Sequence, residues 1–211
     1  MVSGGGTNLQ AIIDAIEAKR LDAAIRVVIS NRQDAFGLAR ANKHNIPTEV
    51  LDPKKYSSRE AYDEAIVAIL REHGVELVIL AGFMRLLSPV LVQAYSNRIM
   101  NIHPALLPSF GGLHGQKQAL EHGVRVAGCT VHFVDKECDQ GPIIIQAVVP
   151  AYPDDTEESL SARILKQEHR IYPRAIQLYS EGRLRVVGRK VFVDGLQKDE
   201  DGAMVHPPIK G

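Results

Sequence analysis

The stretch VELVILAGF, residues 75–83, is almost continuously apolar and carries its only charge at Glu76. A strand with an unbroken apolar run is buried on both faces, as the central strands of parallel sheets are. The segment before it, residues 58–74, places apolar residues at helical spacing and stops at Gly74. A helix that leads into such a strand is the repeating unit of a parallel sheet with helical crossovers.

Helices and strands alternate on both sides of this stretch. The periodicity predicts further helices over residues 3–21, 35–45, 88–95 and 157–182. It predicts further strands over residues 23–30, 47–52, 98–103, 128–135 and 142–150, and a hairpin over 184–195 that turns at Gly188. This order predicts an α/β fold with a doubly wound, mostly parallel sheet flanked by helices, and with a C-terminal hairpin.

The composition indicates one domain over residues 1–211 that handles small molecules. The chain is 45% hydrophobic, and its 25 basic and 25 acidic residues balance. A nucleic-acid-binding protein would show a basic excess, and no apolar run approaches the ~20 residues that span a bilayer. Cys129 and Cys138 form neither a disulfide framework nor a metal-binding spacing, so we expect a reduced, cytoplasmic setting. Residues 196–211 are polar and predict a loosely ordered tail.

The strand at 98–103 ends on two polar side chains. Asn101 and His103 are two residues apart, so they point to the same face, and Pro104 follows at once. Ligands of doubly wound sheets bind beyond the carboxyl ends of strands. An amide at that place can donate to an oxyanion, and an imidazole can move a proton.

A carboxylate that orients the imidazole would complete this pair. The segment DKECDQGP, residues 135–142, offers Asp135, Glu137 and Asp139, and the Gln-Gly-Pro turn after Asp139 fixes its position best. The other histidines indicate surface or core roles, although His114 and His132 could support the site. No metal-binding spacing and no GxSxG motif is present, so neither a metal nor covalent catalysis is expected.

The glycine loop GGGTN, residues 4–8, stands where a first strand should meet the first helix. Backbone N–H groups in such a loop and at a helix N-terminus favour a phosphate, while a simple tight turn is the plainer interpretation. Only Met1 and Val2 precede Ser3, whereas a central strand usually has ~5 residues. The first strand is therefore expected to be short.

Five strings along the chain resemble one enzyme family: GGGTNLQAII (4–13), LAGFMRLLSP (80–89), NIHPALLPSF (101–110), CTVHFVDKECDQGPII (129–144) and QEHRIYP (167–173). They are similar to the phosphoribosylglycinamide formyltransferases, the folate-dependent enzymes of purine synthesis. The resemblance runs collinearly over about residues 3–186. It implies that the formyl group of 10-formyltetrahydrofolate, a cosubstrate, passes to the glycine amine of glycinamide ribonucleotide.

The resemblance also implies residue roles. Asn101 and His103 would face the developing oxyanion, with Asp139 paired to His103. The residues that match the ribonucleotide subsite are Gly6, Thr7, Asn8 and Glu168. The residues that match the folate side are Arg59, Met84, Arg85, Leu86, Leu87, Asn101, Asp135, Lys136, Glu137, Cys138 and Asp139. The glycine-rich segment 111–123 matches a mobile loop near the site.

Other functions remain open at this point. A 10-formyltetrahydrofolate hydrolase or another folate-dependent N-formyltransferase would use a similar Asn-His-Asp set, whereas a non-catalytic nucleotide-binding module would not need it. The molecule could be a monomer or a homodimer. In the resembling family a central strand precedes the phosphate loop, so a short start would leave a slot between its two neighbouring strands.

Overall fold

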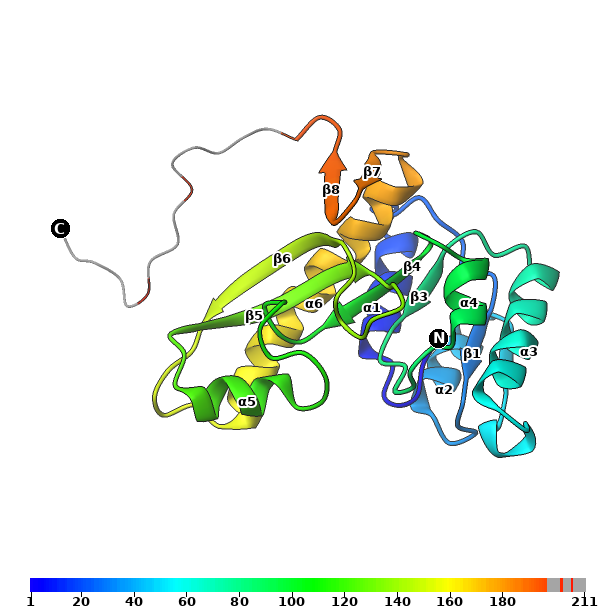
Figure 1. Ribbon diagram of the computed structural model, residues 1–211, viewed down its shortest axis with the longest axis horizontal. Coiled ribbons are helices and arrows are strands. Elements are labelled where there is room, and N and C mark those ends of the chain that lie inside the picture. The colour runs from blue at the N-terminus through cyan, green and yellow to red at the C-terminus, as the bar shows by residue number, and fades with distance from the viewer. Residues whose placement is uncertain (197–201, 203–205, 207–211) are drawn as a thin grey trace.

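The computed structural model describes residues 1–196, 202 and 206 (Figure 1). The helices are α1 (Thr7–Glu17), α2 (Phe36–Lys43), α3 (Arg59–Glu72), α4 (Pro89–Ala94), α5 (Gly115–His122) and α6 (Glu157–Ser180), with a 3-10 turn at Pro53–Lys55. The strands are β1 (Val28–Ser30), β2 (Thr48–Val50), β3 (Val78–Leu80), β4 (Ile99–His103), β5 (Val126–Phe133), β6 (Ile143–Pro150), β7 (Leu184–Val187) and β8 (Lys190–Val193). Apart from Leu196, Gly202 and His206, the tail expected at 196–211 lies outside the described residues.

The strands form a small and a large sheet. Strands β1 and β2 pair in parallel, and the large sheet has the order β3-β4-β5-β6-β8-β7. Strand β3 is parallel to β4, whereas β5 is antiparallel to both β4 and β6. The expected α/β fold with flanking helices is confirmed, and β7 and β8 form the expected C-terminal hairpin around Gly188.

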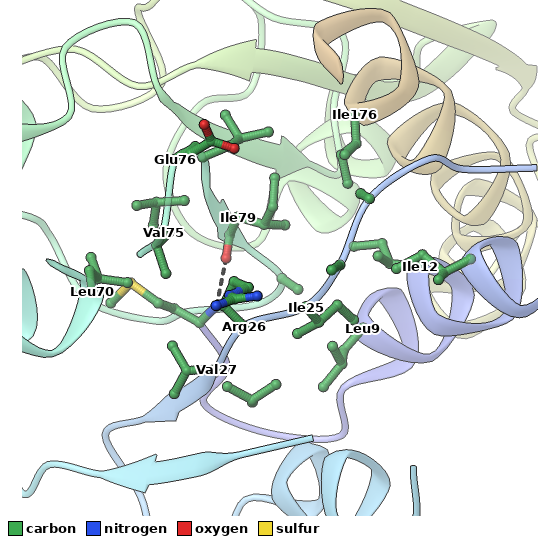
Figure 2. A pocket seen from close by; sticks show the side chains of 18 of the residues that line it. Leu9, Ile12, Ile25, Arg26, Val27, Leu70, Val75, Glu76, Ile79 and Ile176 are labelled. Carbon is green, nitrogen blue, oxygen red and sulfur yellow. Dashed lines mark hydrogen bonds between the residues drawn. The ribbon is translucent and has the colours of Figure 1, made fainter. Parts of the chain in front are cut away.

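Strands β1 and β3 are shorter than the sequence predicts. Each pairs over three residues, although apolar segments run over 23–30 and 75–83. Between them lies only the start of the chain, where Val2 bridges Ser30 in parallel and Ala81 N donates to Met1 O at 2.9 Å. We call the cavity beside this start, about 390 Å³ between β1 and β3, the slot (Figure 2). An opening is expected at this place, because a short first strand leaves the space between its two neighbouring strands unfilled.

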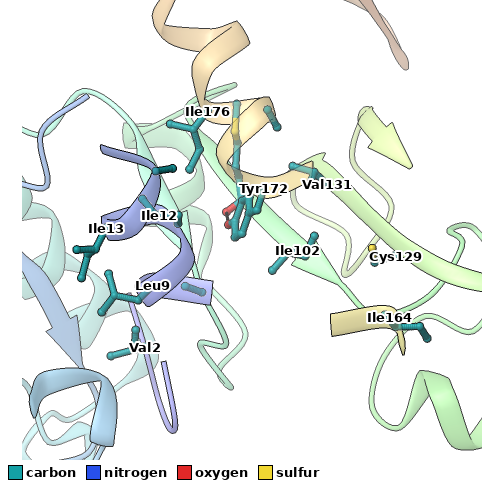
Figure 3. Close-up of a cluster of buried hydrophobic side chains, with 14 of the residues drawn as sticks. Val2, Leu9, Ile12, Ile13, Ile102, Cys129, Val131, Ile164, Tyr172 and Ile176 are labelled. Carbon is teal, nitrogen blue, oxygen red and sulfur yellow. Dashed lines mark hydrogen bonds between the residues drawn. The ribbon is translucent and has the colours of Figure 1, made fainter. Parts of the chain in front are cut away.

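Helix α6 joins α1 to the large sheet in the buried core (Figure 3). It packs on β5 and β6 and also against α1. Its Tyr172 is fully buried, and the hydroxyl lies 3.1 Å from Leu80 O and 2.9 Å from Met100 O. One phenol therefore joins α6 to the carboxyl end of β3 and to Met100 of β4, the residue before Asn101.

No helix in the described part of the chain is both long enough and apolar enough to cross a membrane.

Candidate active site at the end of strand β4

Strand β4, the second strand in the order of the large sheet, carries Asn101 and His103. It is flanked by β3 on one side and β5 on the other, so its backbone is held along its length. The two side chains point the same way because strand residues alternate between faces. The His103 side chain is only 6% exposed. The strand therefore holds these two groups in fixed positions before any substrate arrives.

His103 has an oxygen atom near each ring nitrogen. Its Nε2 lies 3.0 Å from Phe110 O, and its Nδ1 lies 3.4 Å from the Oδ2 of Asp139. Both oxygens are hydrogen-bond acceptors, so each ring nitrogen faces an acceptor. The Asn101, His103 and Asp139 side chains predicted to act together thus lie in one cluster.

Asp139 reaches His103 from a loop after β5. Because β5 runs antiparallel to β4, Phe133 pairs with Met100, and the following loop must turn back to bring Asp139 to His103. Asp139 has a left-handed backbone with φ 54°, and its Oδ2 accepts from Gly112 N at 2.8 Å. The sequence predicted the carboxylate but not the reversed direction of the strand before it.

His132 is the residue that sequence reasoning placed only in a supporting role. It pairs across the strands with Asn101, and its Nδ1 lies 3.0 Å from Phe133 O. Burial lowers the pKa of His132, which favours the neutral ring, and the acceptor at Phe133 O favours a hydrogen on Nδ1. The bare Nε2 then accepts from Asn101 Nδ2 at 3.3 Å. This bond orients the Asn101 amide, and its second N–H has no partner among the described residues.

The glycine loop turns into α1 at Gly6. Gly6 has φ 67°, and a Cβ built on it would come 2.6 Å from Gly37 Cα, so only glycine fits there. A Cβ on Gly4 or Gly5 would meet nothing within 4 Å. No side chain caps α1. The first-turn N–H groups remain available to an anion.

Asn8 and Glu168 meet beside this loop. Asn8 Nδ2 donates to Glu168 Oε2 at 2.7 Å, and both side chains are buried. Burial raises the pKa of Glu168, because the charged carboxylate is poorly solvated. The Oδ1 of Asn8 is buried without a hydrogen-bond partner among the described residues. Buried polar atoms normally have a partner, so this oxygen is an unused acceptor in the site.

The residues that match the folate side lie on the segment after β3 and at the start of α3. Met84 and Leu86, whose apolar side chains are 72% and 61% exposed, follow β3, and the last residue of β3, Leu80, pairs with Asn101 of β4. Arg85 lies over the Tyr62 ring at 4.9 Å, and Leu87 is half-buried. Arg59 begins α3, where its only ion pair within the described residues is a 3.9 Å contact with Glu60.

Two loops expected near the folate differ in structure. Residues 135–139 form a turn in which Glu137 N donates to Asp135 Oδ1 at 2.9 Å, and the Lys136 and Cys138 side chains are solvent-accessible. Most of the glycine-rich segment 111–123, matched to a mobile loop, is helix α5. Residues 111–114 are loop and Gly123 follows the helix, because glycines lie at both ends of the segment and the rest has good helix formers.

Three comparisons bear on this site. A family model described as formyl transferase matches residues 1–176. The chain is 45% identical to phosphoribosylglycinamide formyltransferase of Escherichia coli (strain K12), over 96% of this chain and 95% of that protein. It is 48% identical to the trifunctional purine biosynthetic protein adenosine-3 of Gallus gallus, over 88% of this chain and 18% of that protein. A crystal structure of glycinamide ribonucleotide transformylase 1 from Symbiobacterium toebii matches with a TM-score of 0.90 and 54% identity, covering 91% of each chain.

Proposed function

This chain belongs to the formyl transferase family, and from its similarity to phosphoribosylglycinamide formyltransferases we infer that it formylates glycinamide ribonucleotide with 10-formyltetrahydrofolate. The observation that carries this inference is the identity of 45% over nearly the full length of both chains. A hydrolase or another N-formyltransferase is disfavoured, because the relatives named above act in purine synthesis.

Asn101, His103 and Asp139 would carry the chemistry. The glycine amine attacks the formyl carbon, and the oxygen of that carbon becomes an oxyanion. The second N–H of Asn101 and an N–H of His103 would stabilise this charge. The bond from carbon to N10 of the folate then breaks, while the amine loses a proton and N10 gains one. Asp139 would hold His103 in its protonated form and help to pass that proton.

This role requires one rearrangement near His103. Its Nε2 faces Phe110 O at 3.0 Å, so that N–H is occupied. Phe110 stands before Gly111 and Gly112, and Gly112 has φ 79°, so the backbone there can adopt conformations closed to other residues. We propose that residues 110–112 move when substrates bind, which would release the His103 N–H for the oxyanion.

The ribonucleotide would lie between the glycine loop and α6. The backbone at Gly6, Thr7 and Asn8 would bind the phosphate, while Glu168 and the unpaired Asn8 Oδ1 would accept N–H groups of the substrate. Met84 and Leu86 would supply the apolar wall for the folate. The folate contacts of Arg59, Arg85, Leu87 and residues 135–139 remain predictions, as do the cytoplasmic location, the single domain and the oligomeric state.

The test measures formyl transfer with and without the ribonucleotide. Transfer that requires the ribonucleotide supports the proposal, and turnover without any amine would instead indicate a hydrolase. Asn101→Ala should lower kcat by about 10²–10³, the usual cost of one lost oxyanion donor. A normal thermal melt of this variant would exclude misfolding as the cause, and an unchanged kcat would remove Asn101 from the mechanism.

A further inference from the structure

Few hydrogen bonds hold the backbone of residues 135–140, the loop that carries Asp139 into the site. Two of its amides bond to acceptors within the loop itself. In the described part of the chain, one hydrogen bond joins this backbone to another element, since Arg189 Nη2 donates to Gln140 O at 2.8 Å. Gln140 follows Asp139 directly, so this bond holds the chain next to the carboxylate.

Arg189 stands at the tip of the C-terminal hairpin. The last paired residues of β7 and β8 leave Gly188 and Arg189 as a two-residue turn. Gly188 has φ 58°, and a positive φ at the first position is typical of such turns. The base of the hairpin is fixed to α6, because Arg183 N donates to Leu178 O at 3.0 Å. The hairpin therefore extends from α6 and presents Arg189 at its far end.

The pairing of β8 with β6 places this tip beside the loop (Figure 1). Lys190 of β8 pairs in parallel with Ile143 of β6, the one paired position between these strands in the described residues. Parallel strands run side by side in the same direction, so the turn before Lys190 lies next to the chain before Ile143. From there the Arg189 side chain reaches Gln140 O.

The chain after Gln140 is held by β5. A Cβ on Gly141 would overlap Phe133 O, so the backbone packs against β5 where no side chain fits. Phe133 N also donates to Pro142 O at 2.9 Å. With Gln140 held by the hairpin, the fixed segment extends back to Asp139. Without that bond, the fixed segment would begin only at Gly141.

The contacts of the Asp139 carboxylate depend on where the loop lies. Its Oδ2 accepts from Gly112 N at 2.8 Å and lies 3.4 Å from His103 Nδ1, while its Oδ1 lies 3.7 Å from His132 Nε2. Hydrogen bonds between nitrogen and oxygen are usually ~2.7–3.2 Å long, so the contact with His103 tolerates little further displacement. The left-handed backbone of Asp139 also has to be held by its surroundings.

We propose that Arg189 is a positioning residue for Asp139, which makes the C-terminal hairpin part of the active site. The bond to Gln140 O keeps Asp139 where its carboxylate meets both His103 and Gly112 N. The inference rests on the proposed function, because it assumes that Asp139 takes part in the proton transfer. The family model matches residues 1–176, so the hairpin lies beyond the matched region.

The first experiment compares two arginines of the same hairpin. Arg189→Ala should lower kcat about tenfold and leave KM for the ribonucleotide unchanged, because misplacement of a reacting group reduces the rate of the chemical step. Arg189→Lys should restore part of the loss, since an ammonium group can still donate to Gln140 O. Arg185→Ala is the matched control, because Arg185 lies over the Phe192 ring, 4.6 Å from its centroid. Its kcat should stay unchanged.

The second experiment needs no substrate. The Gly112 amide donates to Asp139 Oδ2, so its exchange with water, measured by NMR, reports the position of the carboxylate. Arg189→Ala should speed this exchange several-fold, whereas Arg185→Ala should not. Unchanged exchange in Arg189→Ala would overturn the inference whether or not the chain formylates the ribonucleotide. Failure of the proposed function would appear separately, as absent formyl transfer in the unaltered protein.

A double-mutant cycle shows whether Arg189 acts through Asp139. In an Asp139→Ala background, Arg189→Ala should lower kcat by less than about twofold, because two residues that act as a unit are not additive. A further tenfold loss in that background would mean that Arg189 acts independently and would overturn the inference. An equal loss of kcat in Arg185→Ala would overturn it as well, since the effect would then belong to the whole hairpin.

Discussion

The end of β4 and the slot differ in how completely the strands around them are paired. Strand β4 has a partner on each side and runs for five residues, whereas β1 and β3 each pair over three. Around β4, Asn101, His103 and Asp139 all have polar neighbours, whereas the residues of β1 and β3 line a cavity of about 390 Å³. A strand extends only as far as its partner strands pair with it. The proposed reactive groups lie on or beside β4, which has a partner strand on each side.

The largest contrast should appear in catalysis. His103→Gln removes a ring that can hold a hydrogen on both nitrogens, so kcat should fall by about 10³. His73→Gln, a histidine at the end of α3, should leave kcat unchanged. Steady-state kinetics with both substrates measures each variant. A loss of activity in His73→Gln as well would mean that the effect is not local to the site.

Packing should distinguish two neighbouring isoleucines of α1. Ile12 lines the slot and Ile13 does not, although they are 5% and 3% exposed. Ile13→Ala should cost about 4 kcal/mol and Ile12→Ala about 2 kcal/mol, because a side chain beside a void has fewer contacts to lose. Urea unfolding measures both free energies. Equal losses would indicate that the slot is closed in solution.

The terminal amine should make stability depend on pH. Its folded pKa of about 5 lies below the ordinary 8.0, so between these pH values the unfolded chain binds a proton that the folded chain does not. Stability should therefore fall as pH is lowered from 8 to 5, by at most about 1.4 kcal/mol per unit. N-acetylated protein should lack this component. Parallel unfolding profiles for the free and acetylated proteins would contradict the burial of the amine.

The smallest effects concern the glycine loop. Gly5→Ala places its Cβ in open space, so stability should change by no more than about 0.5 kcal/mol. If the loop binds phosphate through its backbone, KM for the ribonucleotide should rise several-fold while KM for the folate stays constant. Gly6→Ala is the contrasting variant: its φ of 67° and the 2.6 Å approach to Gly37 Cα should lower stability itself. Equal KM changes for both substrates in Gly5→Ala would refute the phosphate assignment.

Local patterns in the sequence were sufficient for every α-helix except α5 and for the pair on β4. The alternation of side chains put Asn101 and His103 on one face, and the apolar run at 75–83 marked a central strand. The pairing of strands that lie far apart in the sequence was harder to predict. His132 pairs with Asn101 because β5 is antiparallel, which a pattern read as repeated parallel units could not indicate.

Two further differences also have a physical reason. Strands β1 and β3 begin later than the apolar segments predict, because pairing depends on the partner strand, and the sequence near residues 23–27 and 75–77 says nothing of that partner's length. Helix α5 formed within a segment rich in glycine because its glycines lie near the ends, at Gly115 and Gly123, where helix termini tolerate them.

The phenol of Tyr172 gives the molecule an optical reporter at high pH. The chain has six tyrosines and no tryptophan, so near-ultraviolet absorbance changes come mainly from tyrosine. Burial raises the pKa of Tyr172 well above 10, and raises that of Tyr62 to about 12, whereas an unfolded tyrosine ionises near ~10. Above that pH the unfolded chain releases protons that the folded chain retains, so stability falls as pH rises. The last phenolate to appear in an alkaline titration therefore marks the separation of α6 from β3 and β4.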